Sequence, residues 1–169
     1  MIIASIVIPI YNEEFFIEEC VNSILESTFN RSQFEIILMD GLSTDNTLSI
    51  LNRIDFKNIS VSLIQNPERR VSHAMNKGIK ISQGKYVIRM DAHTTYDPNY
   101  ISNCVQLLDR GIAVNVGGPM IVRPSNHFEH AIAMATSSKF GVGNSNFHFE
   151  HFEGYVDTVY LGAFDKTLF

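Results

Sequence analysis

The most constraining feature of this chain is a series of short, apolar, β-prone runs that alternate with segments of helical periodicity. The strand-length runs lie at residues 2–10, 34–39, 59–64, 86–90, 112–116 and 155–161. Between them, apolar residues recur every three or four positions, as in an amphipathic helix. The first run is apolar nearly throughout, which is typical of a strand covered on both faces. This alternation predicts an α/β fold with a mostly parallel central sheet flanked by helices.

Polar residues and glycines mark the predicted helix boundaries. Asn12 is expected to cap a helix that contains Ile17 and Leu25, and Asp97 is expected to cap another, with Pro98 at its first position. Gly84 suits the left-handed residue that ends the helix before it. The remaining signals are a capping-box pattern at Asn126 and Glu129, a long loop over residues 140–154, and a helix that begins at Asp165.

Composition limits the class of protein. The chain has 169 residues, enough for one domain with a substantial core, and a net charge of −5, which argues against a non-specific nucleic-acid binder. Its two cysteines, Cys20 and Cys104, lie at apolar helix positions and are predicted to be buried free thiols. No apolar run is long enough to span a bilayer. A cytoplasmic location is expected, and attachment to the inner face of the membrane through residues outside this chain stays open.

Polar residues also follow four of the predicted strands. They are Tyr11-Asn12-Glu13, Asp40-Gly41, Asn66 with Arg69-Arg70, and Asp91 with His93. Taken singly, each group has a structural interpretation as a cap, a turn or a solvated surface. Ligands of open α/β sheets bind at the carboxyl ends of strands, so the recurrence of these groups favours a common site.

The residue types at these strand ends suit a nucleotide and a cation. Asp91 and His93 are one residue apart and point the same way from an extended backbone, so both can reach one metal ion. The glycine-rich fingerprints for dinucleotides and for phosphate loops are absent. A nucleotide would instead stack on Tyr11 and donate from a base imide to Asp40, while the cation and Arg70 would offset the charge of a diphosphate.

The order of these motifs resembles an inverting glycosyltransferase of family 2. The resemblance rests on residues 5–13 (SIVIPIYNE), 40–47 (DGLSTDNT), 66–70 (NPERR) and 74–79 (AMNKGI). Asp91-Ala92-His93 stands where that family has its Asp-x-Asp metal motif, with His in the third position. Together with residues 156–164 (VDTVYLGAF), this looks most like the succinoglycan-biosynthesis branch.

The resemblance implies a fold of the GT-A type and a donor site for a nucleotide sugar, with UDP-sugars preferred. The residues that it places in this site are Pro9, Tyr11, Glu13, Asp40, Arg70 and Asp91. Asp91 and His93 would bind Mn²⁺ or Mg²⁺, and the imidazole slightly favours Mn²⁺. The acceptor would be a carbohydrate or lipid-linked hydroxyl in polysaccharide or glycolipid synthesis, and no nucleic acid is expected as partner.

The resemblance leaves the catalytic base without a convincing residue. In the family the base is usually an Asp of a Glu-Asp pair downstream of the Gly-x-Phe segment, which here falls beyond Phe169. Asp157 is a weak candidate, and His148 and His151 are weak candidates for contact with the acceptor. Residues 1–169 are therefore expected to be the N-terminal portion of one catalytic domain that is truncated at its C-terminal end.

Two other classes of protein stay open. A nucleotidyltransferase that makes sugar nucleotides can use a similar sheet and metal, although it normally carries an early glycine-rich basic loop that residues 10–14 lack. A non-catalytic module that binds nucleotide sugars is the second alternative, and it gains weight if a longer protein also lacks a carboxylate base.

Overall fold

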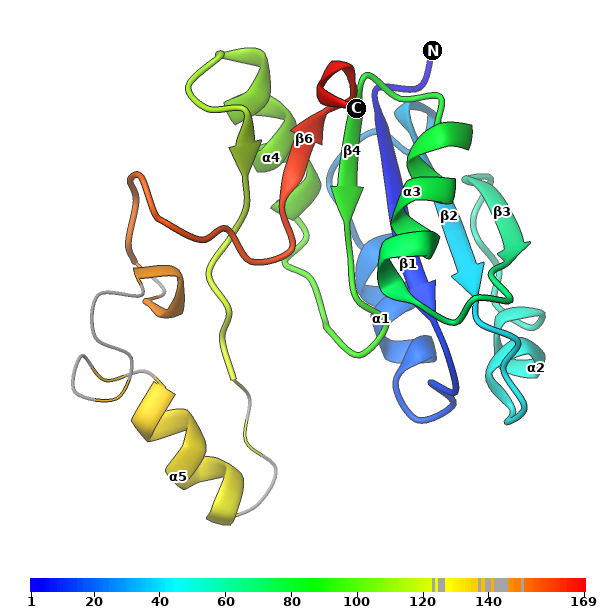
Figure 1. Cartoon of the computed structure of the whole chain (residues 1–169), viewed down its shortest axis with the longest axis horizontal. Helices are drawn as coiled ribbons and strands as arrows, with labels where there is room; N and C mark the ends of the chain where they lie inside the picture. The colour runs from blue at the N-terminus through cyan, green and yellow to red at the C-terminus, as the bar shows by residue number, and fades with distance from the viewer. Residues whose placement is uncertain (123, 125–126, 137, 139–140, 142–145, 150) are drawn as a thin grey trace. The chain divides into compact units, whose positions relative to one another are not determined.

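The computed structural model describes residues 1–122, 124, 127–136, 138, 141, 146–149 and 151–169. Contacts divide the chain into two compact units (Figure 1). Unit 1 comprises residues 1–116 and 163–169, and unit 2 comprises residues 117–162. The prediction that residues 1–169 form one truncated catalytic domain stays a prediction.

Unit 1 contains a six-stranded sheet in the order β3-β2-β1-β4-β6-β5. The strands are β1 (Ala4–Ile10), β2 (Phe34–Asp40), β3 (Ser60–Gln65), β4 (Tyr86–Arg89), β5 (Asn115–Val116) and β6 (Ala163–Asp165). Pairings β3·β2, β2·β1 and β1·β4 are parallel, whereas β6 is antiparallel to β4 and β5. The sheet is therefore mixed, and the predicted α/β fold with a mostly parallel sheet is confirmed.

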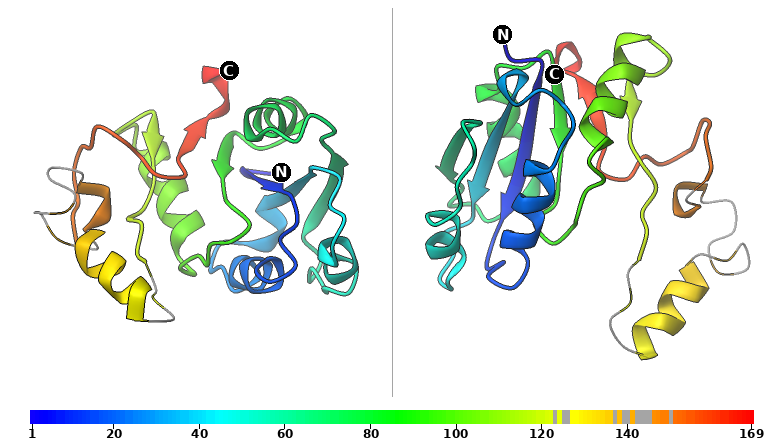
Figure 2. Two further views of the ribbon diagram at one scale, coloured as in Figure 1. Left: turned by 60° about the horizontal axis from the view of Figure 1, so that its bottom comes forward. Right: turned by 180° about the vertical axis from the view of Figure 1, so that it is seen from behind.

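Helices cover both faces of this sheet (Figure 2). They are α1 (Ile17–Leu25), α2 (Thr47–Leu51), α3 (Val71–Ile81) and α4 (Tyr100–Asp109), with 3₁₀ turns at Arg31–Gln33 and Lys166–Leu168. Side chains from α1 and α4 pack in one core cluster, and side chains from α3 pack in the other. The result is a three-layer arrangement of helices, sheet and helix.

The apolar run of β1 is explained by these two cores. Ile6 and Ile8 pack on the side of α1 and α4, while Val7 between them packs on the side of α3. Successive strand residues point to opposite faces, so a strand between two helical layers is buried on both faces and is mostly apolar. Each such side chain contributes about 1.5–3 kcal/mol by burial. Gly78 lets α3 approach this strand, because a Cβ there would lie 2.4 Å from Cγ1 of Val7.

Unit 2 contains α5 (His127–Thr136) and a 3₁₀ turn at Asn146–His148. The amide of Met120 donates to the carbonyl of Phe147, and the ring of Phe147 stacks on that of Tyr160 at 6.5 Å. The capping-box prediction at Asn126 and much of the predicted loop over residues 140–154 lie outside the described residues. In the described part of the chain, no helix is long and apolar enough to cross a membrane.

Two predicted strands near the end of the chain need correction. Residues 155–161 were predicted as a strand but form irregular backbone, and β6 follows them instead. A strand needs a hydrogen-bonding partner, and it is Ala163–Asp165 that pairs with β4. Similarly, the run at 112–116 is paired only at Asn115–Val116, while Ile112 and Val114 are exposed.

Several predicted helix boundaries are also wrong. Asn12 does not cap α1, which begins at Ile17. Asp97 accepts from the amide of Asn99 and so caps the turn at residues 98–99, whereas α4 itself begins at Tyr100. Gly84 is not a left-handed residue. It is required by close packing, because a Cβ there would lie 2.7 Å from the amide nitrogen of Ser5. Asp165 does cap a helix, but a 3₁₀ one, by accepting from the amide of Thr167.

Candidate functional site

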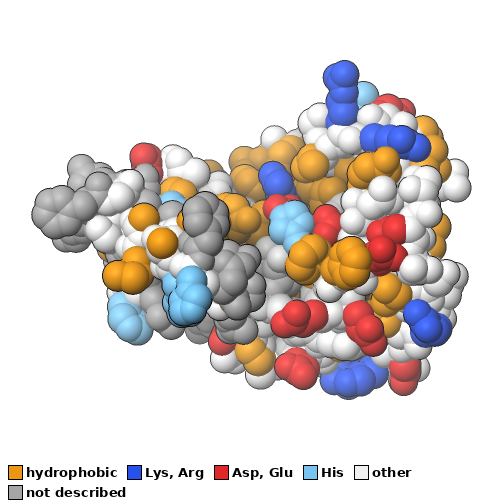
Figure 3. Space-filling model, turned by 90° about the horizontal axis from the view of Figure 1, so that it is seen from below, with side chains coloured by type: hydrophobic (Ala, Val, Ile, Leu, Met, Phe, Trp, Pro, Cys, Tyr) orange, Lys and Arg blue, Asp and Glu red, His pale blue; other side chains and the backbone are white. Residues whose placement is uncertain are grey.

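A pocket of about 150 Å³ lies in unit 1 at the carboxyl ends of the parallel strands. Hydrophobic, acidic, basic and histidine side chains gather on this face of the molecule (Figure 3). The residues that line the pocket include Pro9, Tyr11, Glu13, Gly41, Asn66, Arg69, Arg70, Arg89, Asp91 and His93. Three of the four groups of strand-end residues noted in the sequence therefore contribute polar side chains to this pocket, and the second group contributes Gly41.

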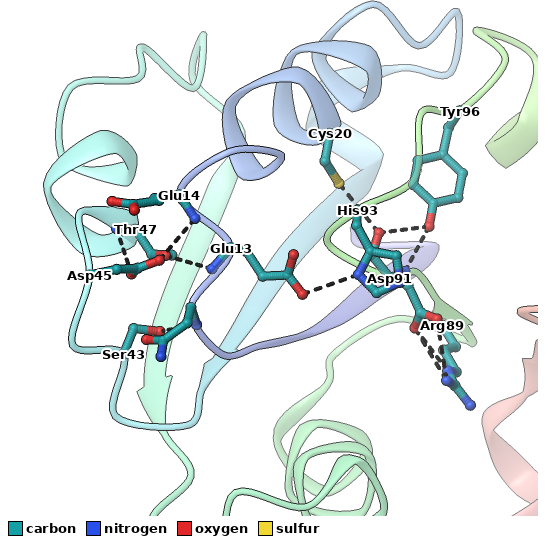
Figure 4. Close-up of polar contacts among 11 residues, drawn as sticks. Glu13, Glu14, Cys20, Ser43, Asp45, Thr47, Arg89, Asp91, His93 and Tyr96 are labelled. Atoms are coloured by element: carbon teal, nitrogen blue, oxygen red, sulfur yellow. Dashed lines mark hydrogen bonds and ion pairs between the residues drawn. The ribbon is translucent and has the colours of Figure 1, made fainter. Parts of the chain in front are cut away.

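The loop after β1 is fastened to the loop after β2 by side-chain caps (Figure 4). Asn12 accepts from the amide of Thr44 at 2.8 Å, and the amide of Glu13 donates to the hydroxyl of Thr47 at 2.8 Å. Asp45 accepts from the amide of Glu14 at 3.1 Å. Burial opposes ionisation of Asp45, but these hydrogen bonds and those from Thr47 outweigh it and hold its pKa below the ordinary value. Asn12 thus joins two loops, which explains why it is not a helix cap.

The backbone of three of these loops is strained. Asn12, Leu42 and Arg69 have positive φ angles of 54°, 62° and 53°, and they follow β1, β2 and β3 respectively. For residues other than glycine this conformation costs about 1–3 kcal/mol, and such strain clusters at functional sites. Of these three residues Arg69 lines the pocket, and the other two are next to residues that do. The remaining positive φ angles of non-glycine residues in the described part of the chain lie elsewhere, at Lys57, Asn58 and Leu161.

Asp91 and His93 both line the pocket, although Ala92 and His93 form a turn and not the extended backbone that the sequence predicted. The carboxylate of Asp91 accepts from Nε and Nη2 of Arg89, each at 3.2 Å, so its charge is paired in the structure. Arg89 was not among the predicted site residues. It is the last residue of β4, two positions before Asp91, and the two-residue period of an extended chain could have indicated that both point to the same face.

Glu13 reaches His93 across the pocket. Oε1 of Glu13 lies 3.1 Å from Nδ1 of His93 (Figure 4). When Nδ1 carries the proton and donates it to Glu13, the lone pair of Nε2 is left for a cation, as in the carboxylate–histidine arrangements of metal sites. The resemblance places Glu13 near the nucleotide, whereas the contact in the structure is with the predicted metal ligand.

Asp40 is buried at the end of β2 and does not line the pocket, although Met39 and Gly41 on either side do. Its carboxylate accepts from the amide of Leu42 at 3.1 Å and from the hydroxyl of Ser43 at 2.6 Å. These bonds hold the loop after β2. The role of Asp40 in recognising a base stays a prediction.

Asn66, by contrast, has an atom without a partner. Its side chain is buried and lines the pocket, and its amide nitrogen donates to the carbonyl of Arg70 at 3.2 Å. Its Oδ1 has no hydrogen-bond partner among the residues that the structure describes. Such a buried acceptor costs free energy unless a water or ligand donates to it. Asn66 was noted in the sequence but was not assigned a role.

Tyr11 is half-exposed at the edge of the pocket with Arg69 over it. The guanidinium carbon of Arg69 lies 5.1 Å from the centre of the Tyr11 ring, and Nη1 donates to the Tyr11 hydroxyl at 3.4 Å. Arg70, the predicted diphosphate contact, follows Arg69 in the chain, lines the same pocket and immediately precedes α3. Two arginines and an aromatic ring therefore border the same pocket.

The weak candidates lie in unit 2. Asp157 is exposed on irregular backbone, and His148 packs against Phe147 with 4.1 Å between ring centres. His148 also borders a pocket of about 190 Å³ within unit 2, together with His130 and apolar residues that include Met134. His151 is exposed. Within the described segments of unit 2, none of these residues has a contact that indicates catalysis.

The donor set at Asp91 and His93 suits a metal that is shared with a ligand. In residues 1–122 and the other described segments, no group of three His, Cys, Asp or Glu side chains could enclose an ion. Mg²⁺ is commonly held by one or two carboxylates together with substrate phosphates and water, and an imidazole is compatible with Mn²⁺. Two protein ligands beside a pocket fit a cation that arrives with a diphosphate.

Comparison with known proteins decides the family. The model of glycosyl transferase family 2 matches residues 5–159. The chain belongs to this family. It is 29% identical over 97% of its length to a dolichyl N-acetyl-α-D-glucosaminyl phosphate 3-β-D-2,3-diacetamido-2,3-dideoxy-β-D-glucuronosyltransferase of Methanococcus voltae, covering 53% of that protein. It is 32% identical over 83% of its length to the succinoglycan biosynthesis protein ExoA of Rhizobium meliloti, covering 43%. The chain thus spans about half the length of the curated relatives that it matches.

Solved structures of other glycosyltransferases share the fold. A mannosyltransferase of Pyrobaculum calidifontis in complex with GDP-Man and Mn²⁺ superposes with a TM-score of 0.67 at 24% identity, covering 98% of this chain and 45% of that one. Residues 1–349 of TarS from S. aureus superpose with a TM-score of 0.66 at 17% identity, covering 99% and 48%. At these identities the likeness shows the fold, which is of the GT-A type as predicted.

Proposed function

We propose that this chain forms the donor-binding part of a metal-dependent inverting glycosyltransferase that uses a nucleoside-diphosphate sugar, with UDP-sugars preferred. The observation that carries the proposal is the convergence of Tyr11, Asn66, Arg70, Asp91 and His93 on one pocket in a member of family 2. Because the chain spans about half of its relatives, the activity of the whole protein is part of the proposal.

The pocket offers a partner for each part of a nucleotide. The half-exposed ring of Tyr11 gives the base a surface for stacking, and the free Oδ1 of Asn66 accepts a hydrogen bond from a base or ribose. Asp40, which is buried next to the pocket, is proposed to select uracil by accepting a hydrogen bond from it, after its hydrogen bonds to Leu42 and Ser43 rearrange. Arg69 and Arg70 supply positive charge toward the diphosphate.

Asp91 and His93 would hold Mn²⁺ or Mg²⁺, and when bound the ion offsets the charge that develops on the diphosphate leaving group. Glu13 keeps the ring of His93 in the required orientation, and Arg89 pairs with the carboxylate of Asp91. Binding of a cation at Asp91 therefore competes with Arg89, which is then available to the phosphates on the same side of β4.

The reaction proposed for the whole protein is a single displacement with inversion. The oxygen of an acceptor hydroxyl bonds to the anomeric carbon as the bond to the diphosphate breaks, and a carboxylate takes the hydroxyl proton. No residue of the described part of the chain is assigned as this base. The relatives' names include polysaccharide and lipid-linked products, so a carbohydrate or lipid-linked acceptor is proposed.

The proposal is tested by calorimetric binding of UDP, UDP-glucose and GDP to the 169-residue chain, with Mn²⁺ and with EDTA. We expect UDP to bind more tightly than GDP, and Mn²⁺ to strengthen binding. Asp91→Ala should remove the dependence on Mn²⁺. Asp109→Ala is the matched control, because Asp109 is a carboxylate on α4 that pairs with Lys85 away from the pocket.

Binding of UDP that is equally tight with Mn²⁺ and EDTA would contradict the metal dependence. A preference for GDP over UDP would contradict the choice of nucleotide and leave the family assignment intact. Unchanged Mn²⁺ dependence in Asp91→Ala would remove Asp91 from the metal site.

A further inference from the structure

The main chain of Asp91 is held by a single hydroxyl group. Asp91 lies just beyond β4, where the chain has left the sheet. Its amide donates to the hydroxyl oxygen of Tyr96 at 2.7 Å, and that hydroxyl donates to its carbonyl oxygen at 3.2 Å (Figure 4). A phenol has one proton to donate and lone pairs to accept, so one side chain satisfies both backbone groups of the residue.

Helix α1 fixes this arrangement from the other side. The thiol of Cys20 donates to the carbonyl of Asp91 at 3.5 Å, and the hydroxyl of Ser23 accepts from the amide of Tyr96 at 3.1 Å. Ser23 in turn donates to the carbonyl of Cys20 at 2.7 Å. Both ends of the segment from Asp91 to Tyr96 are thereby attached to one helix.

The surroundings keep both side chains protonated. Burial raises the pKa of the Tyr96 phenol well above its ordinary value and raises the pKa of the Cys20 thiol to about 12. Each group is therefore a hydrogen-bond donor at neutral pH. Tyr96 does not line the pocket, so it has no direct contact with a ligand there.

We propose that Tyr96 is a positioning residue for donor binding, which acts by fixing the main chain of Asp91 and so the direction of its carboxylate. This inference rests on the proposed function, in which Asp91 binds the cation. Groups that orient metal ligands typically contribute about 10–100-fold to metal affinity. Without the phenol hydroxyl, the amide and carbonyl of Asp91 lose this hydrogen-bond partner, so the main chain that carries the carboxylate is held less firmly.

A purely structural role for Tyr96 makes a different prediction, and Tyr86 supplies the matched control. Tyr86 is buried and Tyr96 is partly buried, and both carry a hydrogen-bonded hydroxyl, but that of Tyr86 donates to Asp109 at 2.5 Å and not to Asp91. Tyr86→Phe removes the same atom at a place away from the pocket. Both variants should lower the melting temperature, whereas only Tyr96→Phe should change the response to metal.

The experiment measures the affinity of the whole chain for UDP with Mn²⁺ and with EDTA. The quantity compared between variants is the ratio of the affinity with Mn²⁺ to the affinity with EDTA. We expect Tyr96→Phe to lower this ratio about 10-fold or more, and Tyr86→Phe to leave it unchanged. Cys20→Ala, which removes only the weaker thiol bond to the same carbonyl, should lower the ratio by a smaller factor. If Tyr96→Phe does not fold, as judged by circular dichroism, Cys20→Ala still has to lower the ratio.

The outcomes separate the two proposals. If the unaltered chain, Tyr96→Phe and Cys20→Ala all show the same ratio of UDP affinity with Mn²⁺ to that with EDTA, and this ratio is above one, the positioning role is overturned and the proposed function stands. If Mn²⁺ does not change the UDP affinity of the unaltered chain, the metal-dependent function is overturned, and the role of Tyr96 with it. Equal losses of the ratio in Tyr96→Phe and Tyr86→Phe would show a general effect of stability and would also overturn the positioning role.

Discussion

The two units of this chain use apolar side chains in different ways. In unit 1 both faces of the sheet are covered, and large side chains such as Ile6, Phe34 and Ile36 have no exposed surface. In unit 2, Met134 and Tyr155 are 73% and 80% exposed. Among the described residues of unit 2, Leu161 is the one apolar side chain that counts as buried.

This difference indicates where the free energy of folding comes from. Burial of apolar surface is the dominant favourable contribution to folding, and it is concentrated in unit 1. The proposed donor site is also built there, on the ends of strands whose positions the core fixes. Unit 1 therefore has both the stability and the geometry that a preorganised binding site requires.

The largest expected effect is on stability, and it compares the same type of substitution, isoleucine to alanine, in each of the two units. Ile36→Ala, in the middle of β2, should lower the free energy of unfolding by about 2–5 kcal/mol, because it leaves a cavity in the core. Ile121→Ala in unit 2, where the side chain is 48% exposed, should change it by about 0.5 kcal/mol or less. Urea denaturation measures both. Equal losses would show that unit 2 has a core of its own.

The next effect concerns binding and compares two histidines. His93→Ala in unit 1 should weaken Mn²⁺-dependent UDP binding by at least about 10-fold, because it removes a proposed metal ligand together with the partner of Glu13. His148→Ala in unit 2 should leave that affinity unchanged, since its ring packs against Phe147. Calorimetric titration measures both, and a loss in His148→Ala would extend the donor site into unit 2.

The smallest effect is a difference in thiol reactivity. Burial raises the pKa of Cys20 and of Cys104 to about 12, so both thiols are protonated at pH 8 and should react slowly with iodoacetamide until urea unfolds the chain. Met134→Cys would place a third thiol at an exposed position of unit 2, and it should react quickly. Rapid labelling of the native cysteines would contradict a tightly packed unit 1.

The same pKa values give the sign of a pH dependence. The ordinary thiol pKa is 9.0, and the folded value is higher. Between about pH 9 and pH 12 the unfolded chain releases thiol protons that the folded chain keeps, so the folded state loses stability as the pH rises through this range. Replacing both cysteines by alanine should remove this contribution.

The sequence predicted best where one local pattern is sufficient. The predicted runs for β1, β2, β3 and β4 lie within one or two residues of the observed strands. β1, β2 and β4 are buried on both faces and are therefore mostly apolar, whereas β3 is the edge strand and is only partly buried. Cys20 and Cys104 are free and buried, as predicted. Residues 155–161 also had a strand-like pattern, but the pairing partner β4 is taken by Ala163–Asp165.

At the site, the sequence by itself determined which strand ends carry polar groups, Asp91 and His93 after β4 among them. Only the tertiary structure decided what each side chain contacts. It pairs Arg89 with Asp91, Glu13 with His93 and Tyr96 with the main chain of Asp91. The physical reason is that a strand pattern has short range, whereas Glu13 and His93 lie 80 positions apart and meet only after the sheet has formed.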